Sequence, residues 1–102
     1  MSNNELITKY ELVFIVDAGL TSTDKEALTK EVADVIGKNG GKVINSQVWL
    51  EKQKFTFDIK KRKEGTYYLL NYEADGAVNA KIQPLFKLNE KILRFSIEKA
   101  ES

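Results

Sequence analysis

Two runs of alternating apolar residues, joined by a short basic segment, constrain the fold of this chain more than any other feature. The first run is 54–59, Lys-Phe-Thr-Phe-Asp-Ile, and the second is 66–72, Thr-Tyr-Tyr-Leu-Leu-Asn-Tyr. Alternation with a period of two is typical of β-strands, and the connecting segment contains Gly65, which is suited to a turn. The sequence therefore predicts a β-hairpin whose turn lies within residues 60–65.

Two further segments have the pattern of strands. Residues 10–16, Tyr-Glu-Leu-Val-Phe-Ile-Val, are apolar on both faces, as is usual for a strand in the middle of a sheet. Residues 92–98 alternate between apolar and polar side chains, which predicts a strand with one face in water. The strand that enters the hairpin is expected to begin at Lys42 and to be interrupted or bulged around residues 51–53.

Two segments have the 3.6-residue period of amphipathic helices. The first is expected to begin near Ser22, because Thr23 and Glu26 have the spacing of a capping box, and to end at Asn39-Gly40-Gly41. The second follows the N-cap candidate Asp75, and Pro84 within it is expected to kink or shorten the helix. The apolar stripes are Leu28, Val32, Val35 and Ile36 in the first helix, and Val78, Ile82, Leu85 and Phe86 in the second.

The order βαββαβ predicts an α+β fold of the ferredoxin-like type. We expect a four-stranded antiparallel sheet with both helices on one face, in a single domain over residues 1–102 with its core at about 8–99. The strands at 10–16 and 66–72 are apolar on both faces. Part of the uncovered sheet face should therefore be apolar and bind a partner.

The composition argues against most enzyme classes. The chain of 102 residues contains no histidine and no cysteine, which removes the usual general base, the thiol nucleophile and the commonest metal ligands. No phosphate-binding glycine loop or paired carboxylates replace them. We expect no catalysis, cofactor, metal or small-molecule substrate. Without a signal sequence or an apolar run of about 18 residues, the expected location is the cytoplasm, with no contact to a membrane.

The formal net charge of +1 hides a local excess of cations. Between Lys52 and Lys63 the chain has six cations and a single acid, Asp58. Such a cluster binds phosphate groups through charge and counterion release, although a charged turn can also be plain solvated surface. Arg62 is the best single candidate because its planar fork can hold a phosphate through two bonds. The candidate phosphate-binding residues are Lys52, Lys54, Lys60, Lys61, Arg62 and Lys63.

The aromatic residues give a weaker signal. Tyr67, Tyr68 and Tyr72 could stack on unpaired bases, but burial of at least one of them in the core is the simpler interpretation, and we predict no base stacking. Trp49, the single tryptophan, either anchors an interface or covers the edge of the core.

Four segments together resemble the family of bacterial small-ribosomal-subunit protein six. They are Tyr10 to Asp17, Asn39 to Gly41, Glu64 to Glu73 and Leu88 to Phe95, and the similarity is collinear over residues 8 to 99. The resemblance implies a ferredoxin-like protein that binds 16S ribosomal RNA in the central domain of the small subunit, together with small-subunit protein eighteen. It also implies RNA contacts by Lys60 to Lys63 and by Arg94 in the last strand.

A second hypothesis remains open at this point. Ferredoxin-like domains also serve as small-molecule-sensing modules that pair through the edge of the sheet, and the apolar uncovered face would suit such a role. This hypothesis rests on analogy of fold alone.

Overall fold

The strands and helices follow one another in the predicted order. The computed structural model describes residues 7–59 and 62–100, without the side chains of residues 50–52 and 55–59. The elements are β1 (Ile7–Asp17), α1 (Ser22–Lys38), β2 (Lys42–Ile59), β3 (Arg62–Asp75), α2 (Gly76–Leu88) and β4 (Ile92–Lys99). Among the described residues, no helix is long and apolar enough to cross a membrane.

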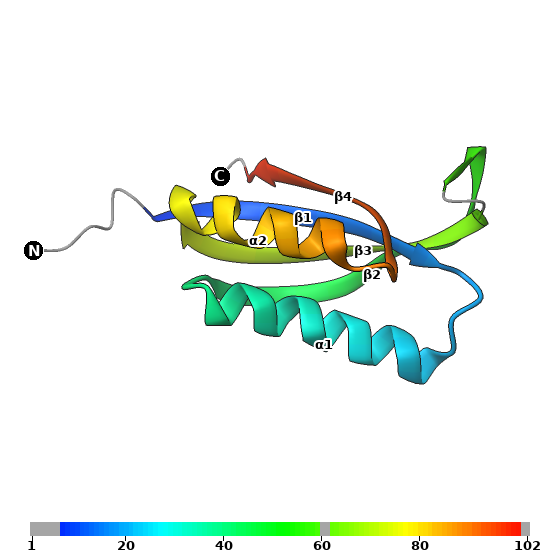
Figure 1. Ribbon diagram of the computed structural model, residues 1–102, viewed down its shortest axis with the longest axis horizontal. Coiled ribbons are helices and arrows are strands. Elements are labelled where there is room, and N and C mark those ends of the chain that lie inside the picture. The colour runs from blue at the N-terminus through cyan, green and yellow to red at the C-terminus, as the bar shows by residue number, and fades with distance from the viewer. Residues whose placement is uncertain (1–6, 60–61, 101–102) are drawn as a thin grey trace, which may run out of the picture.

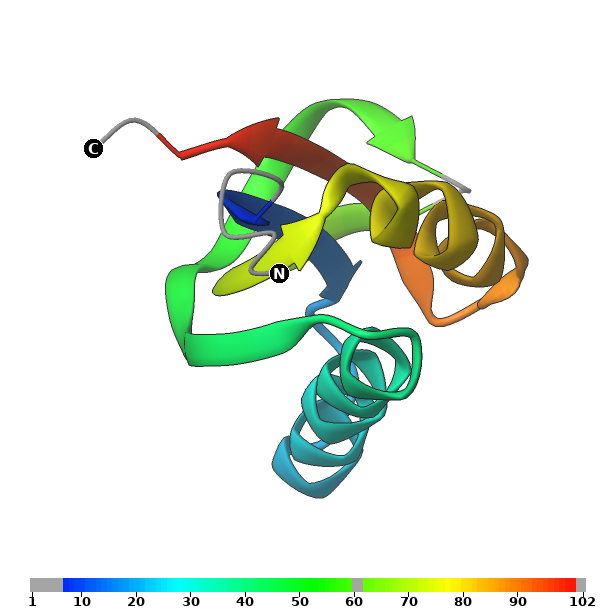
Figure 2. The same ribbon diagram turned by 90° about the vertical axis from the view of Figure 1, so that its left-hand side faces the viewer.

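The four strands form one antiparallel sheet in the order β2-β3-β1-β4. Both helices cover the same face of this curved sheet, as the end-on view in Figure 2 shows. The ferredoxin-like fold class is therefore confirmed. We call the opposite, uncovered side of the sheet the open face. The far end of the β2–β3 hairpin projects beyond the helices in Figure 1.

The core lies between the helices and one face of the sheet. Alternate residues of β1 and β3 point into it, and Phe14 stacks on Tyr68 with ring centroids 5.3 Å apart. Tyr72 is fully buried, and its hydroxyl donates a hydrogen bond to Asn79 Oδ1. Burial, with Tyr10 nearby, raises the pKa of Tyr72. Other buried core side chains are Leu12, Val16, Leu70, Leu28, Val32, Ile36, Val78, Ile82 and Phe86.

The N-terminal caps of the two helices correct one prediction and confirm another. Helix α1 begins at Ser22 as expected, but its N-cap is Thr21, whose hydroxyl accepts a hydrogen bond from the Asp24 N–H at 3.1 Å. The capping box predicted for Thr23 and Glu26 is therefore wrong, because the pair Thr21 and Asp24 occupies these positions two residues earlier. Asp75 caps α2 as predicted, through the Ala77 N–H at 2.9 Å.

Pro84 does not shorten α2. The helix continues through it to Leu88. Proline cannot donate to the carbonyl of Ala80, but both residues are exposed, so water can replace the missing bond.

The hairpin differs from its prediction at Gly65. This residue is not in the turn: it lies within β3, buried and paired with Asp17 of β1 and Gln53 of β2. In β2 the expected bulge is present between Leu50 and Gln53, and the register also shifts at three other places along the strand. These irregularities bend and twist β2 locally.

The predicted helix stop at Asn39-Gly40-Gly41 is confirmed. Asn39 is the C-cap of α1, and Gly40 has a φ of 102°, a conformation that favours glycine. The Gly41 N–H then donates to the Ile36 carbonyl at 2.9 Å. A Cβ at Gly41 would lie 2.5 Å from Cγ2 of the buried Ile36, so this close approach requires glycine.

We therefore expect Gly41→Ala to destabilise the protein by about 1–3 kcal/mol, the usual cost of forcing extra atoms into a packed site. The matched control is Gly37→Ala, in the last turn of α1, where an added Cβ meets nothing within 4 Å. That variant should gain roughly 0.5–1 kcal/mol because alanine is the better helix former. Urea unfolding at 25 °C measures both, and equal midpoints for the two variants would contradict the close approach at Gly41.

Thr66 gives a second test of the core. It is 0% exposed, and among the described residues its hydroxyl has no hydrogen-bond partner. Thr66→Val should raise the free energy of unfolding by about 1 kcal/mol, because it removes a buried polar group that forms no bond. Thr29→Val is the control, since the Thr29 hydroxyl donates to the Lys25 carbonyl at 2.9 Å and its removal should bring no gain. Thermal unfolding compares the two; a lower melting temperature for Thr66→Val would refute the expectation.

Candidate nucleic-acid interface

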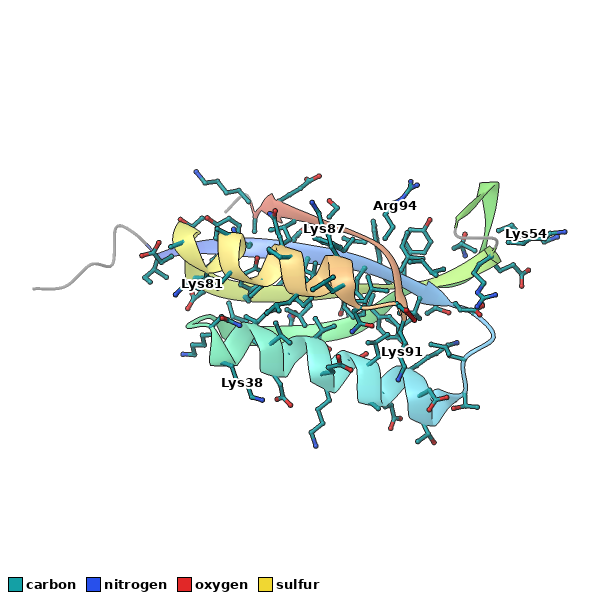
Figure 3. All side chains as sticks on the ribbon, viewed as in Figure 1. Lys38, Lys54, Lys81, Lys87, Lys91 and Arg94 are labelled. Carbon is teal, nitrogen blue, oxygen red and sulfur yellow. The ribbon has the colours of Figure 1, made fainter. Side chains whose placement is uncertain are left out.

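The end of the hairpin carries exposed cations away from the body of the protein. We call residues 54–64 the hairpin end. Lys54 and Lys63 are exposed there, and Figure 3 shows Lys54 beyond the helices. Lys54 lies opposite Glu64 in the sheet register. Lysines on such a protruding segment can reach the phosphates of a large polyanion without displacing other parts of the fold.

Arg62 is not a free cation. Its Nε lies 3.2 Å from Oδ2 of Asp17, the last residue of β1, and about half of the arginine side chain remains exposed. The other oxygen of Asp17, Oδ1, accepts a hydrogen bond from the Gly19 N–H at 3.0 Å. Asp17 therefore connects the turn after β1 to the hairpin end. The two terminal nitrogens of Arg62 are not used in this ion pair.

The structure leaves part of the predicted site undescribed. The backbone of Lys52 lies in β2, but its side chain falls outside the description. Lys60 and Lys61 lie outside the described residues altogether. Their predicted contacts stay predictions.

Arg94 lies on a different part of the surface from Lys54. It is exposed on β4, opposite Ile15 of β1, and its side chain therefore belongs to the open face. Figure 3 shows it above the sheet, well separated from Lys54 at the hairpin end. The predicted cations thus do not form a single patch.

Sequence reasoning missed Lys87. This residue lies in the last turn of α2 and lines, together with Arg94, a shallow hollow of about 550 Å³ between α2 and the edge strand β4. Figure 3 shows Lys87 on the helix and Arg94 on the strand. Lys87 belongs to no run of cations in the sequence. Only the packing of α2 against β4 could have associated it with Arg94.

The aromatic residues are divided between the two sides of the sheet. Tyr68 and Tyr72 are buried on the helix side, as predicted for at least one tyrosine. Trp49 and Tyr67 lie on the open face, with their rings edge to face and centroids 6.3 Å apart. Trp49 is 51% exposed. It therefore belongs to the outer surface and does not cover the core, and its role as an interface anchor stays a prediction.

The described residues contain no group of three or more His, Cys, Asp or Glu side chains that could hold a metal ion. The surface that these residues form is cationic at the hairpin end and around Arg94, and apolar in the middle of the open face. Such an arrangement can bind a polyanion and a protein side by side.

Comparison with known sequences identifies one family. The profile of the family described as Ribosomal protein S6 matches residues 9–99. Proteins named Small ribosomal subunit protein bS6 are 34% identical over 87 residues in Syntrophobacter fumaroxidans, 33% over 88 in Rhodopirellula baltica and 37% over 89 in Lactobacillus acidophilus. The alignments cover 85%, 86% and 85% of this chain and 58%, 62% and 89% of those relatives. The chain thus spans less than two thirds of the first two.

Two solved structures share the fold. The crystal structure of 30S ribosomal protein S6 from Thermotoga maritima matches with a TM-score of 0.83 and 23% identity, over 92% of this chain and 88% of that one. The solution structure of the C-terminal domain of the MgtC protein from Mycobacterium tuberculosis matches with a TM-score of 0.66 and 8% identity, over 98% and 95% of the two chains. At these identities the similarity shows the fold alone.

The two hydrogen-bonding roles of Asp17 can be separated by substitution. Asp17→Asn keeps an oxygen for the Gly19 N–H and removes only the ion pair, which is partly exposed and should contribute less than about 1 kcal/mol. Asp17→Ala removes both interactions and should cost about 1 kcal/mol more. Urea unfolding measures the difference. If the two variants have the same stability, the bond to Gly19 does not hold this turn.

Proposed function

Because the chain belongs to the Ribosomal protein S6 family of the small ribosomal subunit, we propose that it binds 16S ribosomal RNA in the central domain of that subunit, jointly with small-subunit protein eighteen. Its role is structural and involves no catalysis. The observation that carries the proposal is the group of exposed cations, Lys54, Arg62 and Lys63, on the projecting hairpin end.

The hairpin end contacts phosphates rather than bases. Lysine side chains act as point charges and supply affinity with little sequence information. Lys60 and Lys61 add two charges to those of Lys54 and Lys63 in the same segment of the chain. Binding by such a cluster releases counterions from the RNA and weakens steeply as salt is added.

Arg62 makes the most directed contact in this proposal. Asp17 engages Nε of the guanidinium, which leaves the edge with the two terminal nitrogens for a phosphate. Asp17 is in turn held by the turn at Gly19. Asp17 therefore acts as a positioning residue. It already restricts the rotamers of Arg62, so the arginine loses less conformational entropy when it binds RNA.

A second group of cations contacts the same RNA from another side. Arg94 on β4 and Lys87 on α2 line one hollow, and both are exposed. Their separation from the hairpin end suits a folded RNA that meets the protein at two places.

The alternative of a small-molecule-sensing module rests on the fold alone, and family membership favours the ribosomal role.

The test is a salt titration of binding to a central-domain fragment of 16S ribosomal RNA, with and without protein eighteen. We expect tight binding that requires the partner and weakens with salt. Replacing the four cations Lys60, Lys61, Arg62 and Lys63 by alanine should flatten the slope of log K against log salt by about 0.7–0.9 for each phosphate that the variant no longer neutralises.

A matched variant controls for the overall change in charge. Alanine at Lys30, Lys38, Lys42 and Lys81 also removes four positive charges, and these four lysines are exposed and lie outside the hairpin end. This variant should keep the wild-type slope. The same slope for the hairpin variant and the wild type would exclude the hairpin end from the interface, and a wild-type chain that binds no RNA fragment at low salt in either condition would refute the proposed function.

A further inference from the structure

The middle of the open face is apolar and hollowed. The hollow has a volume of about 350 Å³, and Val13, Ile15, Trp49 and Tyr67 are among the residues that line it. Ile15 is only 7% exposed and lies deep in the hollow, whereas Trp49 leaves half of its surface in water. An exposed apolar patch of this kind often marks a surface that another protein covers.

Charged residues line the hollow on both sides of its middle. Arg94 lies toward one end of β4 and Glu98 toward the other, with Ser96 midway between them. Glu98 lies directly opposite Glu11 of β1 in the register of the two strands, and Glu11 lines the hollow as well. We call Glu11 and Glu98 the acidic pair. Because like charges in this position destabilise a sheet, the acidic pair gains from a cation that approaches it.

These charges do not neutralise one another within one molecule. In the described part of the chain, neither Arg94 nor the acidic pair has an ion-pair partner. Arg94 and Glu98 are four residues apart in β4, which at about 3.3 Å per residue is about 13 Å, and an ion pair needs about 4 Å. All three side chains are exposed, so a second molecule can reach them.

The spacing of the charges is self-complementary. Two copies can be placed face to face by a two-fold axis that runs across the strands over Val13 and Ser96, which lie opposite each other in β1 and β4. This rotation keeps each strand over the same strand of the other copy and reverses its direction. Arg94 of each copy then lies over Glu98 of the other, and both contacts form together. Packed sheets align within about 30°, and the long arginine side chain can follow the remaining offset.

We propose that the open face pairs with the open face of a second copy of this chain. Arg94 of each copy contacts the acidic pair of the other, and the apolar surfaces around Val13 and Trp49 cover each other between the two charged contacts. Each contact occurs twice because the interface is symmetric. Tryptophan is also among the residues that most often dominate the binding energy at interfaces.

The size of the face makes this dimer weak. The eight residues of β4 span about 26 Å, and four strands about 4.8 Å apart span about 19 Å, which gives a flat area of about 500 Å² for each copy. A standard interface buries about 800 Å² on each partner. The dimer should therefore form only at high protein concentration, and the two charged contacts should strongly affect its stability.

Self-pairing would compete with RNA for Arg94. The guanidinium cannot contact the acidic pair of a second copy and an RNA phosphate at once, so the dimer withholds this residue from RNA. This consequence, unlike the pairing itself, rests on the proposed function. Chains that have not met RNA would cover their apolar faces with one another, and RNA would release them as monomers.

The test measures sedimentation equilibrium of the full chain without RNA, from about 10 μM to about 1 mM, a range suited to a weak complex. We expect the wild type to dimerise with increasing concentration. Arg94→Glu should weaken the dimer about 10-fold or more, and so should Glu11→Arg with Glu98→Arg, because like charges then meet at both contacts. An equal mixture of these two variants should dimerise about as well as the wild type, since opposite charges meet again.

The controls make the same changes in net charge outside the hollow. Lys81→Glu matches the first variant, and Glu26→Arg with Glu90→Arg matches the second, all at exposed positions. Both controls should dimerise like the wild type. Thermal melts check the fold of every variant. If a charge-reversed chain does not fold, Trp49→Ala should still weaken the dimer with every charge in place.

Three results would overturn the pairing: a wild type that stays monomeric throughout the range, charge-reversed variants that dimerise as well as their controls, or a mixture that does not recover the dimer. A monomeric wild type that binds the central-domain RNA fragment would leave the proposed function standing. If the dimer follows the charges as expected but the same RNA fragment does not dissociate it, the proposed contact of Arg94 with RNA fails and the dimer stands.

Discussion

The central strand β1 is the constraint on which the rest of this structure depends. It pairs with β3 on one side and β4 on the other, so it joins the β2–β3 hairpin to the last strand. Its alternate residues Leu12, Phe14 and Val16 form the middle of the core under the two helices. The residues between them, Val13 and Ile15, line a separate hollow on the open face, beside Trp49 and Tyr67. One stretch of sequence therefore determines both the interior and the middle of the open face.

The order of elements could be predicted because each has a strong local pattern. The period of two in 66–72 and the apolar stripe through Leu28, Val32 and Ile36 were enough to assign a strand and a helix, and Asn39-Gly40-Gly41 marked the end of α1. The errors arose where two local rules competed. Gly65 looked like a turn residue but lies inside a strand, since the pairing of β3 with β1 reaches it and the pairing of β3 with β2 extends past it.

The site was less predictable because its contacts join distant parts of the chain. The run of cations between Lys52 and Lys63 is evident in the sequence, but the ion pair of Arg62 with Asp17 depends on the register of β1 and β3. The same holds for Lys87 and Arg94, which line one hollow, and for Glu11 and Glu98, which lie opposite each other in β1 and β4. Each of these residues is ordinary in its local sequence, and only the alignment of strands or the packing of α2 reveals which charges face one another.

The order of strands in the sheet also affects how the protein can fold while it is being synthesised. The first strand made, β1, finds its partner β3 only after α1 and β2 have been translated, and its other edge stays open until β4 is complete. Most sheet contacts are therefore non-local, which slows folding and prolongs the exposure of unpaired backbone. A nascent chain of this kind would acquire its finished sheet, and with it the alignment of Glu11 and Glu98, only after β4 has been translated.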